Sequence, residues 1–177
     1  MLDSYDLQGT KTFADIGGGH GEVAINVLRR YPQVQAFLFD LPPVAEKAVA
    51  AMENAGLSER CSVVGGDFFD SVPIDADIYF IRGVIGDWND DQCVKLLSNI
   101  AAAARPGARV LLSERLIHGP NEAEHSKQMD ILMMLVLPGR FRTADECNAL
   151  LAASGFRPSG VTETDSFMSV VEGTKEK

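Results

Sequence analysis

Asp15-Ile-Gly-Gly-Gly-His-Gly21 follows a short apolar run, Thr12 to Ile16, and precedes a stretch from Glu22 to Tyr31 that carries regularly spaced apolar residues. The apolar run is typical of a buried strand, and the later stretch of a short helix that ends before Pro32. The glycines between them allow a tight turn and the close approach of a ligand to the backbone. A strand, a glycine turn and a helix in this order predict a nucleotide-binding βα unit.

The spacing of these glycines disfavours a dinucleotide. In the GxGxxG fingerprint the third glycine follows the second by three positions, whereas here Gly19 is followed by Gly21, and position 22 is Glu. The carboxylate of Glu22 would lie close to where a pyrophosphate rests on the helix N-terminus, which is electrostatically unfavourable. A cofactor that carries an amino acid and a sulfonium meets no such objection, so a nicotinamide dehydrogenase is the disfavoured alternative.

The rest of the chain alternates expected strands and helices. Strands are expected at 35–40, 61–65, 76–81 and 109–116, and helices at 44–55, 90–104, 122–137 and 143–153. Two closing strands, 159–164 and 167–172, are a hairpin candidate around Asp165-Ser166. This order predicts one α/β domain with a seven-stranded, mostly parallel sheet, helices on both faces and a C-terminal antiparallel hairpin.

The composition excludes several classes of protein. The chain has 177 residues and a formal net charge of −9, which argues against a nucleic-acid partner, because phosphates require clustered Lys and Arg. The longest apolar run, Ile131 to Pro138, is far shorter than the ~20 residues of a membrane span. Three widely spaced cysteines suit a reducing cytoplasm and predict neither disulfides nor a metal site.

Acidic residues follow two further strands. Asp40 ends the second expected strand, where a carboxylate can hold both hydroxyls of a ribose. Asp67 and Phe68 follow the third, where a carboxylate can accept from an adenine amino group and a ring can cover the base. Both places lie with the glycine loop at the carboxyl edge of the sheet, where open α/β sheets bind ligands. An adenosine-containing cofactor is therefore expected, and a plain tight turn is the alternative for the loop alone.

These residues and several longer stretches resemble the S-adenosylmethionine-dependent O-methyltransferases of the plant caffeate and hydroxyindole type and their bacterial polyketide-tailoring relatives. The resemblance covers nearly the whole chain in family order. The stretches are DIGGGHG at 15–21, FDLPPV at 39–44, GGDFF at 65–69, DWND at 87–90, RPGARVLLSERL at 105–116, MDILMMLVLPGR at 129–140 and RTADECNALLAASGF at 142–156. It implies a Rossmann-like class I methyltransferase fold, with residues 1–177 as the catalytic domain.

The resemblance also implies roles for individual residues. The expected cofactor is S-adenosyl-L-methionine, with S-adenosyl-L-homocysteine as its product. The positions expected to bind it are Asp15, Gly17, Gly18, Gly19, Asp40, Leu41, Asp67, Phe68 and Arg82. Asp87, Met129 and Met133 are candidates for the acceptor pocket. Helix capping is the alternative role for Asp87, and core packing for the two methionines.

Two departures from the family fall on the chemistry. The general base of the family is a histidine directly before the Asp-Trp pair, and this position is Gly86 here. The family orients that histidine with two glutamates, of which one matches Glu114 and the other is replaced by Phe141. The histidines that are present, His20, His118 and His125, are expected in turns and loops. No catalytic residue is therefore assigned.

The function predicted is methyl transfer from S-adenosylmethionine to an oxygen of a small aromatic, phenolic or polyketide-like secondary metabolite, by proximity and without a histidine base. One alternative is a tailoring enzyme that retains the cofactor but hydroxylates or decarboxylates, and another is a non-catalytic cofactor-binding module. In the family an N-terminal winged-helix-like region precedes this domain and forms a dimer. We expect the chain to lack that region, and a longer form to be a homodimer.

Overall fold

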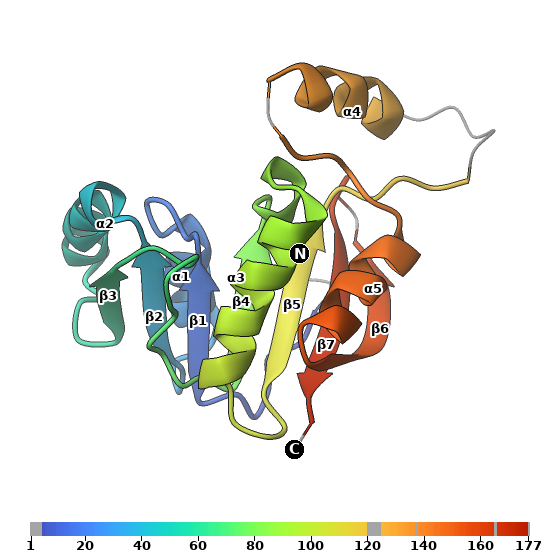
Figure 1. Cartoon of the computed structure of the whole chain (residues 1–177). Coiled ribbons are helices and arrows are strands. Elements are labelled where there is room, and N and C mark those ends of the chain that lie inside the picture. Colours follow the sequence, from blue (N-terminus) through green and yellow to red (C-terminus); the bar gives the residue numbers. More distant parts are fainter. Residues whose placement is uncertain (1–4, 120–124, 137, 165, 177) are drawn as a thin grey trace.

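The computed structural model describes residues 5–119, 125–136, 138–164 and 166–176. They form one seven-stranded sheet with helices around it (Figure 1). The strands are β1 (Thr12–Ile16), β2 (Gln35–Asp40), β3 (Cys61–Gly65), β4 (Ile78–Arg82), β5 (Arg109–Glu114), β6 (Phe156–Glu163) and β7 (Ser169–Lys175). The helices are α1 (Glu22–Arg30), α2 (Pro42–Ala55), α3 (Asp90–Ala103), α4 (His125–Val136) and α5 (Ala144–Ala153), with a 3₁₀ helix η1 (Ile85–Asp87).

The strand order of the sheet is β3-β2-β1-β4-β5-β7-β6. Strands β1 to β5 are parallel, and β7 is antiparallel to both β5 and β6. The expected α/β class, the seven strands and the C-terminal antiparallel pair are therefore confirmed. The order reverses between β1 and β4, and a reversal of this kind opens a crevice at the carboxyl ends of the two strands.

Two hydrophobic cores cover opposite faces of the sheet. Adjacent residues of β1 point to opposite faces, so Phe13 packs with α1 and α2, while Ala14 packs with α3 and α5. Figure 1 shows α3 and α5 in front of the sheet. Because both faces are buried, the central strands are nearly continuous runs of apolar residues, which is the pattern expected of a parallel sheet.

Several elements begin or end a few residues away from their expected bounds. The helix expected at 44–55 begins at Pro42, because proline is well suited to the first turn of a helix, where its missing N–H has no partner to lose. The fourth strand begins at Ile78 instead of 76, because the N–H of Ala76 donates to the Tyr79 hydroxyl and not to a neighbouring strand. The closing strands occupy 156–163 and 169–175. Asp165 of the expected hairpin, and 122–124 and 137 of the expected long helix, lie outside the described residues.

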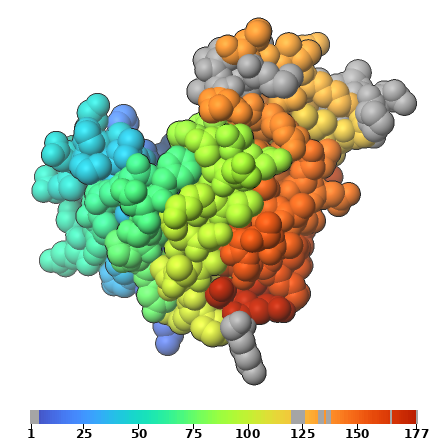
Figure 2. Space-filling model, viewed as in Figure 1, coloured from blue at the N-terminus to red at the C-terminus, as the bar shows by residue number. Residues whose placement is uncertain are grey.

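Helix α4 stands beyond the carboxyl ends of β4 and β5 (Figure 1). Figure 2 shows this helix projecting from the rest of the surface, with a hollow between it and α2. Ile131 and Leu135 on α4 are 59% and 78% exposed. Across the described ranges, no helix has the length and apolarity that crossing a membrane requires.

Candidate functional site

The glycine loop after β1 exposes its backbone at the reversal point of the sheet. Gly17 and Gly19 have φ values of +69° and +58°, which favour glycine. A Cβ at Gly17 would lie 2.9 Å from Val84 Cγ2, whereas a Cβ at Gly19 would meet nothing within 4 Å. The loop is therefore packed against the segment after β4 on one side and open at Gly19, where a ligand can approach the backbone.

Asp40 ties the end of β2 to this loop. Its Oδ2 accepts the N–H of Gly19 at 2.8 Å, and its Oδ1 accepts the N–H of Leu41 at 2.7 Å. These bonds orient the carboxylate at the carboxyl edge of the sheet, where it is partly exposed. The side chain of Leu41, next to it, is half exposed. Asp40 can thus accept hydrogen bonds from hydroxyl groups of a ligand in the crevice.

Asp15 lies beneath the loop and is 1% exposed. Its carboxyl group accepts a hydrogen bond from the N–H of Ala24, and burial raises its pKa to about 7. Within the described part of the chain, Oδ2 of Asp15 has no hydrogen-bond partner. A Cβ at Gly18 would lie 2.9 Å from this oxygen, so glycine is what allows the loop to pass so close. A buried acceptor without a partner is able to bind a donor group of a ligand.

Asp67 and Phe68 follow β3 and belong to the same edge. Asp67 is exposed, and its Oδ1 accepts the N–H of Phe69 at 2.8 Å. The ring of Phe68 reaches the glycine loop, because Phe68 Cε1 lies 3.9 Å from the Cβ position of Gly17. The structure therefore brings the ends of β1, β2 and β3 together as expected.

An aromatic cluster links this edge to the segment after β4. The ring centroid of Phe69 lies 4.8 Å from that of Phe68 and 4.8 Å from that of Trp88, both in edge-to-face geometry. Arg82 ends β4 and is exposed, and its charge favours the ionised form of Asp15. The segment after β3 and the 84–88 segment are therefore in direct contact.

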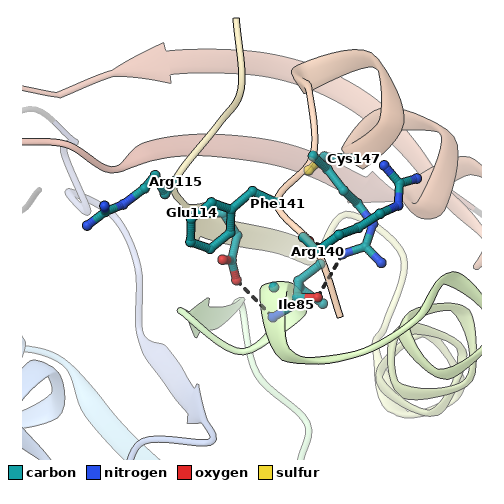
Figure 3. A pocket seen from close by; sticks show the side chains of 8 residues that line it. Ile85, Glu114, Arg115, Arg140, Phe141 and Cys147 are labelled. Carbon is teal, nitrogen blue, oxygen red and sulfur yellow. Dashed lines mark hydrogen bonds between the residues drawn. The ribbon is translucent and has the colours of Figure 1, made fainter. Parts of the chain in front are cut away.

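Gly86, the position of the missing base, is buried in η1 and faces the side chains of Phe141 and Glu114. Figure 3 shows these two side chains next to each other, close to Ile85. A Cβ at Gly86 would lie 3.3 Å from Phe141 Cδ1 and 3.7 Å from Glu114 Oε2. The cavity next to it has a volume of about 10 Å³. This is near the lower limit for one water molecule, so the ring of Phe141 fills most of the space beside Gly86.

Glu114 supports the turn that contains Gly86. Its Oε1 accepts the N–H of Val84 at 3.1 Å and the N–H of Ile85 at 2.9 Å. The side chain is buried, and desolvation raises its pKa to about 7. Asp87 is partly buried, and burial raises its pKa as well. The ends of β4 and β5 therefore carry two carboxyl groups that are easier to protonate than usual.

Two residues that hold this turn were missed by the sequence analysis. Arg142 is 2% exposed and donates to Ile85 O and Trp88 O, each at 2.8 Å, and to Asp90 Oδ1. Gly139 packs directly on the turn, since a Cβ there would lie 2.1 Å from Gly86 O. The sequence contains no signal that separates this arginine from exposed ones, because its burial depends on the approach of distant segments.

Helix α4 lies next to the site, beyond the carboxyl ends of β4 and β5 (Figure 1). Met129 on α4 is partly buried, and Asp130 Oδ1 accepts the N–H of Phe141 at 2.6 Å, which ties the helix to the 139–142 segment. Met133 lies on α4, but its side chain, like that of His125, is outside the described residues. His20 and His118 are exposed, as expected for loop residues. In the described ranges, no group of three metal-binding side chains occurs.

Comparisons with known proteins identify a family for this chain. The family model of the O-methyltransferase domain matches residues 1–157. The phenazine O-methyltransferase of Lysobacter antibioticus is 38% identical over 172 residues, which are 97% of this chain and 50% of that protein. The aclacinomycin 10-hydroxylase of Streptomyces purpurascens is 31% identical over 179 residues, 97% of this chain and 48% of that protein.

A solved structure of an O-methyltransferase also resembles this chain. An O-methyltransferase from neocarzinostatin biosynthesis, in complex with S-adenosylmethionine and 2-hydroxy-5-methyl naphthoic acid, matches with a TM-score of 0.88 and 31% identity, covering 97% of this chain and 51% of that one. The chain spans about half the length of the curated relatives it matches.

Proposed function

The chain belongs to the O-methyltransferase domain family, and on that premise we propose that it transfers a methyl group from S-adenosylmethionine to an oxygen of a small aromatic acceptor without a histidine base. The observation that carries the second half of the proposal is the contact between Gly86 and the ring of Phe141, which leaves no proton acceptor at this position. The relative bound to a naphthoic acid supports the aromatic acceptor.

The carboxyl edge of the sheet fits this cofactor. Backbone at Gly19 faces open space, the carboxylate of Asp40 is oriented toward the crevice, and the buried Oδ2 of Asp15 is an acceptor in need of a donor. When bound, S-adenosylmethionine supplies a methyl carbon attached to a positively charged sulfur. We assign Asp40 with Leu41 to the ribose and Asp67 with Phe68 to the adenine.

The remaining residues of the edge would hold the methionine part of the cofactor. Gly17, Gly18 and Gly19 would lie along it, and the positive charge of Arg82 would face its carboxylate. Asp15 would accept a hydrogen bond from the cofactor with its unpartnered oxygen. The charges are complementary, because carboxylates meet hydroxyl and amino groups while the guanidinium meets a carboxylate.

The chain itself would contribute orientation and the exclusion of water. Glu114 is a poor candidate for the base, because its Oε1 already accepts two backbone N–H groups and Phe141 covers the cavity beside it. The acceptor oxygen must then be ionised on its own. Orientation of two reactants in a dry site can supply a large part of the rate enhancement without a proton acceptor.

The test is the pH dependence of methyl transfer for two phenols whose own pKa values differ by about two units. We expect a mass gain of one methylene with formation of S-adenosylhomocysteine, and a pH midpoint that moves with the pKa of the phenol. A midpoint near 7 for both phenols that disappears in Glu114→Gln would instead identify Glu114 as the base.

Hydroxylation, with dioxygen as the oxidant and an added two-electron reductant, is the second candidate function, favoured by Gly86 together with the relative named as a hydroxylase. The same mass measurement separates the two, because a product that gains an oxygen atom in place of a methylene contradicts methyl transfer. No turnover of any phenol, with normal binding of S-adenosylhomocysteine, would favour a non-catalytic cofactor-binding module.

A further inference from the structure

We propose that the acceptor is an aromatic acid whose carboxylate is bound by the guanidinium of Arg115. This inference rests on the proposed function, because it concerns the acceptor of the same site. Arg115 follows Glu114 at the carboxyl end of β5 and lies next to Phe141, beside Gly86. The cavity there is only large enough for one water molecule, so the carboxylate of the acceptor would meet the guanidinium outside it, next to the exposed ring of Phe167. Figure 3 shows Arg115 on one side of the Phe141 ring and Arg140 on the other.

The first argument is charge. Three arginines line this cavity, and two of them are neutralised: Arg140 pairs with Glu146 at 2.7 Å, and Arg142 pairs with Asp90 at 2.7 Å. Among the residues that the structure describes, no carboxylate lies within ion-pair distance of Arg115. In a site whose other cations are paired, its charge is available to an anionic ligand.

The second argument is the way in which the guanidinium is held. Its Cζ lies 4.4 Å from the ring centroid of Phe167 and 5.7 Å from that of Phe141. Contacts with rings occupy the faces of a guanidinium, whereas its N–H donors point outward in its plane and remain available for a bidentate carboxylate. Phe167 is 68% exposed, and Arg115 and Phe141 are partly exposed. Aromatic surface next to a cation suits a planar, aromatic anion.

The third argument is position. Strand β4 lies between β1 and β5, so Arg115 is two strand spacings, about 10 Å, from the end of β1 and its glycine loop. Val84 fills the space between, because its Cγ2 lies 2.9 Å from the Cβ position of Gly17 and its N–H donates to Glu114. The carboxylate of the cofactor therefore has Arg82, at the end of β4, as its nearer cation. We therefore assign Arg115 to the acceptor.

The experiment compares the binding of 3-hydroxy-2-naphthoate with that of its methyl ester, measured by calorimetry on the chain saturated with S-adenosylhomocysteine. The acid is expected to bind about tenfold more tightly than the ester, as a hydrogen-bonded charge pair would give. Arg115→Gln should remove this preference and leave the affinity for the ester unchanged. Arg115→Lys should keep part of it, because the charge remains but the planar fork is lost.

The matched control is Arg105→Gln, which removes an exposed cation that precedes β5 and pairs with Asp75 and Asp77. It lowers the net charge equally and should keep the preference for the acid. Binding of S-adenosylhomocysteine and the thermal unfolding midpoint are measured for each variant, so that loss of folding is recognised.

Three outcomes would overturn the inference: equal affinities for acid and ester, a preference for the acid that survives Arg115→Gln, or no binding of the acid by the chain loaded with S-adenosylhomocysteine. Failure of S-adenosylhomocysteine itself to bind would contradict the proposed function instead. The two failures are therefore distinguishable.

Discussion

The ring of Phe141 occupies the space above Gly86, so that a Cβ at position 86 would lie only 3.3 Å from Phe141 Cδ1. In the family pattern these two positions carry a histidine and a glutamate that orients it. Their contact here explains why both differ together: a carboxylate at position 141 without an imidazole to pair with would be a buried polar group lacking its partner. A phenyl ring next to a glycine fills the same volume without that cost.

Gly86→His should therefore destabilise the chain by about 2 kcal/mol, because the imidazole and the Phe141 ring compete for one space. The double variant Gly86→His with Phe141→Glu should recover part of this loss, with a favourable coupling of about 1 kcal/mol between the two sites. Urea unfolding of the two single variants and the double variant measures the coupling. Strictly additive effects would contradict a shared space.

Gly139→Ala should lower the free energy of unfolding by about 3 kcal/mol, because the new methyl group would overlap Gly86 O and the backbone of Asp87. Gly160→Ala is the matched control, since a Cβ there meets nothing within 4 Å. Thermal or urea unfolding of both variants decides the matter. Equal stabilities for the two would show that the 139 segment does not pack on η1 in solution.

Asp40→Asn should weaken the binding of S-adenosylhomocysteine about tenfold or more, because it removes a charged acceptor for the ribose hydroxyls and weakens the bond to Gly19 N–H. The thermal midpoint should change little, since the side chain is partly exposed. Asp70→Asn, an exposed carboxylate after β3, serves as the control. Calorimetric affinities that are the same for both variants would remove Asp40 from the cofactor site.

The stability of the chain should fall as the pH rises from about 4 to about 7. Burial raises the pKa of both Asp15 and Glu114 to about 7, so the folded state binds protons in this range that the unfolded state has already lost. Their stabilising contribution is full below the unfolded pKa and is lost as the pH passes the folded one. For Glu114 the difference corresponds to about 3 kcal/mol.

Urea unfolding at several pH values tests this slope. Glu114→Gln should make the free energy of unfolding depend less on pH, because the amide oxygen still accepts the two backbone N–H groups but does not titrate. The control Glu53→Gln, on the exposed face of α2, should leave the pH dependence unchanged. Below about pH 4 the trend should reverse, since hydrogen bonds to Thr12, Lys11 and Arg105 lower the pKa of Asp77 to about 2. A stability that rises steadily from pH 4 to 7 would contradict the prediction.

The cofactor edge of the site was accessible to sequence reasoning because its signals are local. The glycine turn follows one apolar strand, and the acidic residues follow the next two. Because the carboxyl ends of parallel strands lie at the same edge of a sheet, chain order alone predicts that these residues lie close together. The bounds of β1, β2 and β3 agree with expectation for the same reason. The assignment of Asp40, Asp67 and Phe68 to parts of a nucleoside remains a prediction.

The acceptor side was not accessible in this way. Arg142 and Gly139 act on η1 from more than 50 residues further along the chain, and neither their burial nor their partners can be read from neighbouring residues. Whether Arg115 can bind an anionic ligand also depends on which of the neighbouring arginines form ion pairs. The carboxylates that pair with Arg140 and Arg142 belong to α3 and α5. Close packing of distant segments decides such contacts.

By itself, then, the sequence determined the α/β architecture, the crevice at the carboxyl ends of the strands and the absence of a side chain at position 86. These features can be predicted from hydrophobic periodicity, glycine positions and chain order, all of which can be recognised in short stretches of sequence. Only the tertiary structure decided that Phe141 fills the space beside Gly86, that Glu114 holds the turn and that Arg115 keeps its charge unpaired among the described residues. These are properties of residues from three separate segments, and they exist only once the core has brought those segments within a few ångströms of one another.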